Sequence, residues 1–137
     1  MAKRATPPSK SGFSIPMAFL IGGAICTIGE AFSNLYLYLG MEPDVAGACV
    51  SITLIFLSAL LTGLNVYDNI ASIAGAGTLV PITGFANAVA APALEFKSEG
   101  YVLGLGAKMF IIAGPVIVYG VAAGVFYGIL VFLFGFY

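Results

Sequence analysis

Long apolar runs, separated by short polar connectors, dominate this chain of 137 residues. Residues 13–39, residues 45–67 and the uncharged stretch after Lys108 each exceed the roughly 20 residues that cross a hydrocarbon core. Charged residues make up only 8% of the chain, whereas a soluble domain carries roughly a quarter. Five basic and six acidic residues cannot cover the surface of a water-soluble globule of this length. We therefore predict an all-α, polytopic integral membrane protein surrounded by the lipid bilayer.

The positions of these runs predict the domain organisation. Residues 1–12 hold three basic residues and two prolines and have little to bury, so we expect a disordered, basic tail. Residues 13–137 are expected to form a single membrane domain with three full spans, at about 13–39, 45–67 and 109–135. The first run is too long for the apolar region of a signal peptide and is expected to stay in the mature protein. A glycine and a proline between the first two spans predict an antiparallel helical hairpin.

Residues 69–98 do not have the pattern of a simple span. The segment is apolar in bulk, but residues that break helices or need polar partners interrupt it: Asn69, Gly75, Gly77, Pro81, Gly84, Asn87 and Pro92. Irregular backbone inside a membrane is tolerated only where protein or a water-filled cavity satisfies its polar groups. We therefore predict a broken or re-entrant helical segment, followed by an aqueous loop that holds Glu95, Lys97 and Glu99. Residues 101–108 are expected to form a short interfacial helix.

The basic residues predict the orientation of the chain. Those of the N-terminal tail place the N-terminus in the cytoplasm, so the acidic connector at residues 42–44 lies on the opposite side. If residues 69–98 re-enter the membrane and return, Lys97 and Lys108 are also cytoplasmic, and the C-terminus lies outside. If the segment crosses fully, the C-terminus lies inside. We favour re-entry because it places all five basic residues on the cytoplasmic side.

Polar residues recur at helical spacing in the first two spans and place one stripe on each helix. The first stripe consists of Gly23, Thr27, Glu30 and Asn34, and the second consists of Ser51, Ser58, Thr62 and Asn65. An acid inside a membrane is a functional hypothesis by default, although a protonated Glu30 bonded to a neighbouring helix is an equally good interpretation. Hydroxyls in membrane helices also often bond the backbone of their own helix or join two helices. Two facing stripes together predict a polar seam in the interior of the bundle.

The last span carries three glycines at intervals of four residues, Gly120, Gly124 and Gly128. Small residues at this spacing let another helix approach closely. Because the pattern is common in membrane helices, it predicts tight packing within the chain or between chains without naming a partner. Three or four short helices hardly enclose a pore for a solute larger than an ion, so we expect the chain to be an oligomer.

Several classes of function are not expected. The chain has no histidine, and Cys26 and Cys49 lie in apolar runs without metal-binding or redox spacing, so we predict no metal and no cofactor. We find no nucleophile, base and orienting group together, so the chain is not expected to be an enzyme. The net charge of −1 and the lack of basic patches argue against nucleic-acid binding.

Several short motifs resemble a known protein family. The most specific of them is AGAG at residues 74–77 followed by VPITGFAN at residues 80–87. Others are FLIGGAIC at residues 19–26, SALLTG at 58–63, the pair Tyr67 and Asp68, and LEFKSEG at 94–100. Together these motifs are similar to those of the AC/AE-B family of stage V sporulation membrane proteins, over about residues 18–130. The LEFKSEG run favours the AC branch of that family.

The resemblance implies a location and a function. Family members are integral proteins of the forespore and spore inner membrane of endospore-forming bacteria. They act with other proteins of the stage V sporulation A operon, of the AD and AE-B types, to move dipicolinic acid as its calcium chelate into the forespore and out at germination. The alternatives are a mechanosensitive channel of low selectivity and a non-conducting scaffold that recruits partner proteins. One residue departs from the expected family pattern, because Glu30 stands where relatives are expected to have glutamine.

The broken segment is our candidate for the permeation path or its gate. The residues assigned to it are Gly75, Gly77, Pro81, Thr83, Gly84 and Asn87. Glycine permits unusual backbone conformations, proline cannot donate a helical hydrogen bond, and Thr83 and Asn87 lie one turn apart. The alternative interpretation is a kinked helix whose freed carbonyls are satisfied by neighbouring groups.

Overall fold

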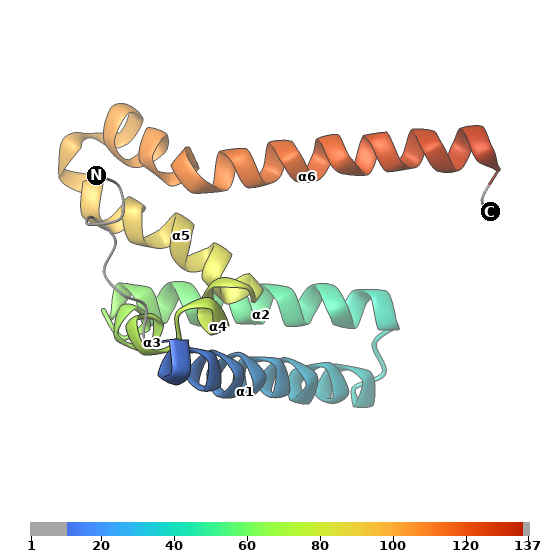
Figure 1. The fold of residues 1–137 in the computed structure, drawn as a ribbon, viewed down its shortest axis with the longest axis horizontal. Coiled ribbons are helices and arrows are strands. Elements are labelled where there is room, and N and C mark those ends of the chain that lie inside the picture. Colours follow the sequence, from blue (N-terminus) through green and yellow to red (C-terminus); the bar gives the residue numbers. More distant parts are fainter. Residues whose placement is uncertain (1–10, 136–137) are drawn as a thin grey trace. The chain divides into compact units, whose positions relative to one another are not determined.

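The computed structural model describes residues 11–135, which are helical apart from short connectors and contain no strand. Three helical stretches are long and apolar enough to cross a membrane, Gly12–Tyr38, Pro43–Gly63 and Tyr101–Phe134, so the predicted fold class is confirmed. The chain divides into two compact units, Met1–Asn87 and Ala88–Tyr137. We describe each unit separately, and Figure 1 labels their helices.

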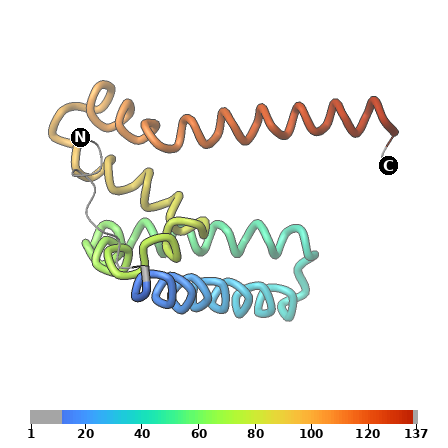
Figure 2. The backbone as a smooth tube through the Cα atoms, viewed as in Figure 1, coloured from blue at the N-terminus to red at the C-terminus, as the bar shows by residue number. Residues whose placement is uncertain are grey.

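The first unit begins with a hairpin of α1 (Ser11–Tyr38) and α2 (Pro43–Gly63), which lie side by side (Figure 2). Helix α1 ends because Gly40 adopts a φ of 86°, which a residue without a Cβ atom reaches at low cost. The Met41 amide then donates to the Tyr36 carbonyl at 3.2 Å and the Gly40 amide donates to the Leu37 carbonyl at 3.0 Å, the pattern of a Schellman motif. The chain reverses within four residues, and Pro43 starts α2.

The second span ends earlier than its apolar run. Helix α2 stops at Gly63, whereas the sequence predicted a span as far as Tyr67. Asn65 adopts a φ of 57°, and the Val66 amide donates to the Leu61 carbonyl at 2.9 Å, so the helix closes with a second Schellman motif. Asparagine tolerates the left-handed conformation better than most residues with a side chain. The chain therefore turns while it is still apolar, and Tyr67 becomes the first residue of the next helix.

Three short helices make up the segment that interrupts the spans. Helix α3 (Tyr67–Ala74) and helix α4 (Ala76–Leu79) are joined by Gly75, whose φ of 51° and ψ of −117° suit only glycine. Pro81 separates α4 from α5 (Ile82–Glu95), whose first turns belong to the first unit. Helices α3 and α4 are too short to cross a membrane, and both pack against α1.

The second unit contains the end of α5, a 3₁₀ turn η2 (Phe96–Glu99), a π-helical turn η3 (Tyr101–Gly106) and α6 (Ala107–Phe134). Gly100, with a φ of 102°, makes the turn between η2 and η3. The η3 turn continues directly into α6, so the helix begins at residue 101, before the start at residue 109 that the sequence predicted. Lys108 Nζ lies 4.4 Å from the centre of the Phe96 ring, a cation–π contact that ties η2 to the start of α6.

The glycine ridge of α6 is open within its own unit. Gly120, Gly124 and Gly128 have no described atom of this unit within 4 Å of the place that a Cβ atom would occupy. We expect Gly124→Leu to reduce assembly more than Val121→Leu, because a side chain at the centre of the ridge blocks close backbone approach. The size of the detergent-stable complex measures assembly. Equal complex sizes for the two variants would contradict a packing role for the ridge.

Candidate functional site

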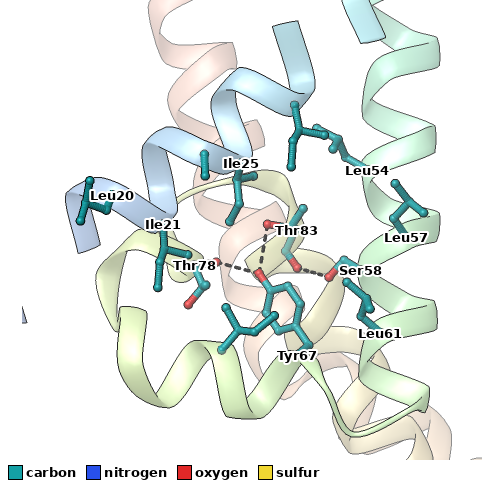
Figure 3. Close-up of a pocket in the computed structure, with 13 residues that line it drawn as sticks. Leu20, Ile21, Ile25, Leu54, Leu57, Ser58, Leu61, Tyr67, Thr78 and Thr83 are labelled. Atoms are coloured by element: carbon teal, nitrogen blue, oxygen red, sulfur yellow. Dashed lines mark hydrogen bonds between the residues drawn. The ribbon is translucent and has the colours of Figure 1, made fainter. Parts of the chain in front are cut away.

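A cluster of polar side chains, all buried except the partly exposed Asn87, joins the end of α2 to the broken segment in the first unit. We call it the polar cluster; it consists of Ser58, Thr62, Tyr67, Thr78, Thr83 and Asn87. Figure 3 shows four of these side chains meeting between the helices. Four helices contribute side chains to the cluster: α2, α3, α4 and α5. They meet here because only short connectors separate the end of α2, the helices α3 and α4, and the start of α5.

Tyr67 occupies the centre of the polar cluster and is only 4% exposed. Its hydroxyl oxygen lies 3.0 Å from the Thr78 carbonyl oxygen and 3.0 Å from Thr83 Oγ1. A carbonyl can only accept, so the single phenol proton is donated to Thr78, and the Thr83 hydroxyl donates to the phenol oxygen. Thr78 lies in the last turn of α4, where Pro81 interrupts the helical hydrogen bonds. Tyr67 thus satisfies a carbonyl group at the helix break.

Two side chains of α2 hold the first turns of α5. Ser58 Oγ donates to the Thr83 carbonyl at 2.6 Å, and Thr62 Oγ1 lies 2.7 Å from Asn87 Oδ1. Each pair is separated by 25 residues, and the pairs occur in the same order along the two helices. The start of α5 therefore runs in the same direction as α2.

Asn87 extends the polar cluster toward the end of α2. Thr62 Oγ1 lies 2.7 Å from Asn87 Oδ1 and 2.8 Å from the Ser58 carbonyl oxygen, and these two acceptors share its single hydroxyl proton. Asn87 Nδ2 points toward Asp68 Oδ1 at 3.5 Å, a long contact with an exposed side chain. Among the described residues, every buried side-chain nitrogen or oxygen has a hydrogen-bond partner. The cluster is therefore a closed network, with no buried donor free to bind a solute in this conformation.

The glycines of the broken segment are used for close packing. Gly77 is buried, and a Cβ atom there would collide with the backbone of Ala18 in α1. A Cβ atom on Gly84 would collide with the backbone carbonyls of Thr78 and Leu79. Gly75 is exposed and provides the turn between α3 and α4. Of the residues predicted to line a path, Thr83 and Asn87 therefore carry the polar side chains. Gly77 and Gly84 let backbone segments touch, and Gly75 makes a turn.

The polar cluster forms one side of a cleft of about 340 Å³ in the first unit. Thirteen residues line it: Leu20, Ile21, Ala24, Ile25, Ile28, Leu54, Leu57, Ser58, Leu61, Tyr67, Ile70, Thr78 and Thr83. Leu20 and Ile28 at its rim are 61% and 50% exposed, whereas Ser58 is 1% exposed. No charged residue lines the cleft, so it would strongly disfavour a bare dianion while the polar cluster stays closed.

The two predicted polar stripes do not meet in this structure. Thr27, Glu30 and Asn34 are exposed, and their hydrogen bonds stay within α1: Thr27 Oγ1 donates to the Gly23 carbonyl at 2.8 Å, and Asn34 Nδ2 donates to Glu30 Oε1 at 3.3 Å. In the second stripe Ser58 and Thr62 are buried, whereas Ser51 donates to the Gly47 carbonyl in its own helix and Asn65 is exposed.

A side-chain bond outside both stripes joins α1 to α2. The hydroxyls of Tyr36 and Thr53 lie 2.7 Å apart, and Phe32 stacks on Tyr36. Sequence reasoning did not single out Tyr36 or Thr53 as contact residues. It also treated Tyr67 only as the end of a span and as part of a family motif. The sequence does hold a signal for Tyr36 and Tyr67. Each tyrosine lies within or beside an apolar run, where its hydroxyl needs a hydrogen-bond partner.

These features define a polytopic helical membrane protein with a broken helical segment and a buried polar cluster. The chain belongs to the SpoVAC/SpoVAEB sporulation membrane protein family, whose model matches residues 14–130, and the resemblance seen in the sequence motifs is confirmed. It is 51% identical over 118 residues to the stage V sporulation protein AC of Bacillus subtilis (strain 168). That alignment covers 85% of this chain and 79% of the relative. No solved structure matches the chain.

Proposed function

We propose that the chain is a subunit of a channel or transporter in the forespore and spore inner membrane that moves dipicolinic acid with calcium, inward during sporulation and outward at germination. Family membership supports this function, because the sequence resemblance implies dipicolinic acid as the solute. The observation that carries the proposal is the buried polar cluster, which connects a broken helical segment to a spanning helix. Broken helices inside membrane domains are typical of the substrate sites of transporters.

The chemistry of the polar cluster suits a small planar dianion. Hydroxyl and amide groups replace part of the hydration shell of a solute without binding it tightly, as conduction requires. In the described conformation these groups satisfy one another, so this conformation is closed. Opening moves α5 and α4 away from α2 and exposes the hydroxyls of Ser58, Thr62 and Thr83 to the solute.

The geometry of α5 supports re-entry of the segment that follows α2. Both side-chain pairs between α2 and α5 have the same order, so the start of α5 runs toward the side on which α2 ends. With the N-terminus in the cytoplasm, that side is the cytoplasmic one, and the broken segment enters and leaves the membrane there. A gate at this place is accessible to cytoplasmic proteins, and we propose the AD and AE-B types of the same operon as partners of an oligomer.

Replacing two residues of the polar cluster tests this function. We expect Thr83→Val with Asn87→Leu to leave membrane levels nearly normal but strongly reduce the dipicolinic acid content of spores. The substitutions remove a donor and an amide from the path while keeping apolar bulk, and the bond from Ser58 to the Thr83 backbone carbonyl is retained. Dipicolinic acid is measured in purified spores that carry the variant as their only copy.

The matched control is Ser51→Ala with Asn69→Leu. Ser51 and Asn69 each donate to the backbone carbonyl four residues earlier in the chain, at 3.0 Å. Neither of these hydrogen bonds involves the polar cluster. Spores with the control variant should contain the normal amount of dipicolinic acid. A normal content in spores with the Thr83 and Asn87 variant would place the path elsewhere and remove the basis of the proposal.

A further inference from the structure

Helix α1 presents a polar face that nothing in its own unit covers. Thr27, Glu30 and Asn34 are exposed on this face, and Cys26, one turn before Glu30, is exposed beside them. Glu30 lies eight residues before the end of α1, so it is roughly 12 Å along the axis from that end of a membrane-spanning helix. Its side chain accepts a hydrogen bond from Asn34 of the same helix.

An exposed carboxylate at this position is unfavourable in lipid. A charged residue within a spanning helix is rare and almost always faces the interior of a bundle or a water-filled cavity. The basic residues among residues 11–135 are Lys97 and Lys108, which lie in and just after the loop that follows α5. Helix α6 carries no charge after Lys108. The described residues of the first unit include no lysine or arginine, so that unit supplies no counter-charge for Glu30.

The same face is complementary to a copy of itself. It carries a strong acceptor, Glu30, one turn from a donor, the Asn34 amide, so two parallel α1 helices can exchange hydrogen bonds between them. Gly23, earlier on the stripe, has no atom within 4 Å of a hypothetical Cβ position, which leaves room for close backbone approach. A hollow of about 350 Å³ between α1 and α4 adjoins this face at Gly23 and Cys26.

We infer that the α1 face formed by Gly23, Cys26, Thr27, Glu30 and Asn34 is the contact between two copies of this chain in the membrane. In that contact the Asn34 amide of each copy donates to the Glu30 carboxylate of the other. The two carboxylates face a hydrated seam, which removes the cost of exposing them to lipid. The inference concerns assembly and holds whatever solute the protein moves.

Disulfide cross-linking through the native Cys26 tests this contact. We replace Cys49 with alanine, so that Cys26 is the sole thiol of the test variant. Membranes that contain this variant are then treated with an oxidant, which takes up the two thiol hydrogens as the disulfide forms. We expect a band of twice the chain mass on a non-reducing gel, which a reductant abolishes. A disulfide needs Cβ atoms about 3.5–4.5 Å apart, so it reports close approach of the two faces.

The control moves the thiol to another face of the same helix. The control variant combines Cys49→Ala and Cys26→Ala with Ile28→Cys. Its sole thiol is then at residue 28, about 200° around α1 from residue 26, where the native side chain is 50% exposed. This variant should give little dimer. Equal dimer from both positions would indicate random collision and overturn the inference.

Three further results would also overturn the inference. A Cys26 thiol that reacts with a membrane-permeant maleimide but forms no dimer would show a free face. A thiol that neither reacts nor dimerises would show that another part of the chain covers it. A disulfide from Cys26 to a different protein, with no dimer of this chain, would assign the face to a heteromeric contact instead.

Discussion

The variant Tyr67→Phe is expected to give the largest functional change, a protein that inserts normally but no longer holds its solute. The substitution keeps the ring and removes only the hydroxyl that bonds the Thr78 carbonyl and the Thr83 side chain, both at 3.0 Å. A buried polar group left without a partner costs about 1–3 kcal/mol, so the closed arrangement of the polar cluster is weakened by that amount. Under the proposed function, spores then release dipicolinic acid without a germinant.

Leakage is measured as dipicolinic acid in the medium around dormant spores over several days. Tyr36→Phe is the matched control, because it also removes a tyrosine hydroxyl bond, the 2.7 Å contact with Thr53, but does so between α1 and α2, away from the polar cluster. We expect the Tyr36→Phe spores to retain their content. Retention in both variants would show that the Tyr67 hydroxyl has no role in closing the path.

A second large effect is expected for Gly77→Val, which should remove the folded protein from the membrane. A Cβ atom at Gly77 collides with the Ala18 backbone, which belongs to a spanning helix and cannot move aside as a flexible side chain does. Overpacking typically costs about 1–3 kcal/mol, and we place a backbone collision at or above the upper end of that range. The protein level in membranes, measured by immunoblot, should fall to a small fraction of the wild-type level.

Gly47→Val is the control for this variant, because the Cβ position at Gly47 in α2 has no atom within 4 Å. Both variants place a β-branched residue in a helix, so the loss of helix propensity is matched. We expect the Gly47 variant to be present at nearly the wild-type level. If Gly77→Val reached the same level, the close packing of α4 on α1 would not be a requirement of the fold.

The number of spans could be predicted from the sequence because a membrane imposes a length on any helix that crosses it. The end of α2 could not be predicted in this way, because the apolar run continues through the turn that ends the helix. The signal there is conformational, since Asn65 adopts a left-handed φ and the Val66 amide reaches back to the Leu61 carbonyl. The same run of apolar residues therefore contains both the end of a span and the start of α3.

The polar residues were predicted in two separate groups, and the structure combines them differently. Ser58 and Thr62 were assigned to a seam, and Thr83 and Asn87 to a path, but the four bond to one another. Periodicity shows which residues share a helix face and not what that face meets. It therefore could not show that Ser58 and Thr62 of the α2 stripe are buried whereas the α1 stripe around Glu30 is exposed.

The role of the polar cluster as the gate of a dipicolinic acid path is tested most directly by solute efflux from vesicles that contain the purified protein. We predict slow efflux from wild-type vesicles at rest, faster efflux with Tyr67→Phe, and efflux below the wild-type rate with Thr83→Val and Asn87→Leu when osmotic tension is applied. Tyr67→Phe is thus expected to raise the efflux at rest, whereas the double variant is expected to lower the efflux under tension. The account would be contradicted if wild-type vesicles released no dipicolinic acid, at rest or under tension, and if vesicles with either variant also released none. That result would favour a scaffold.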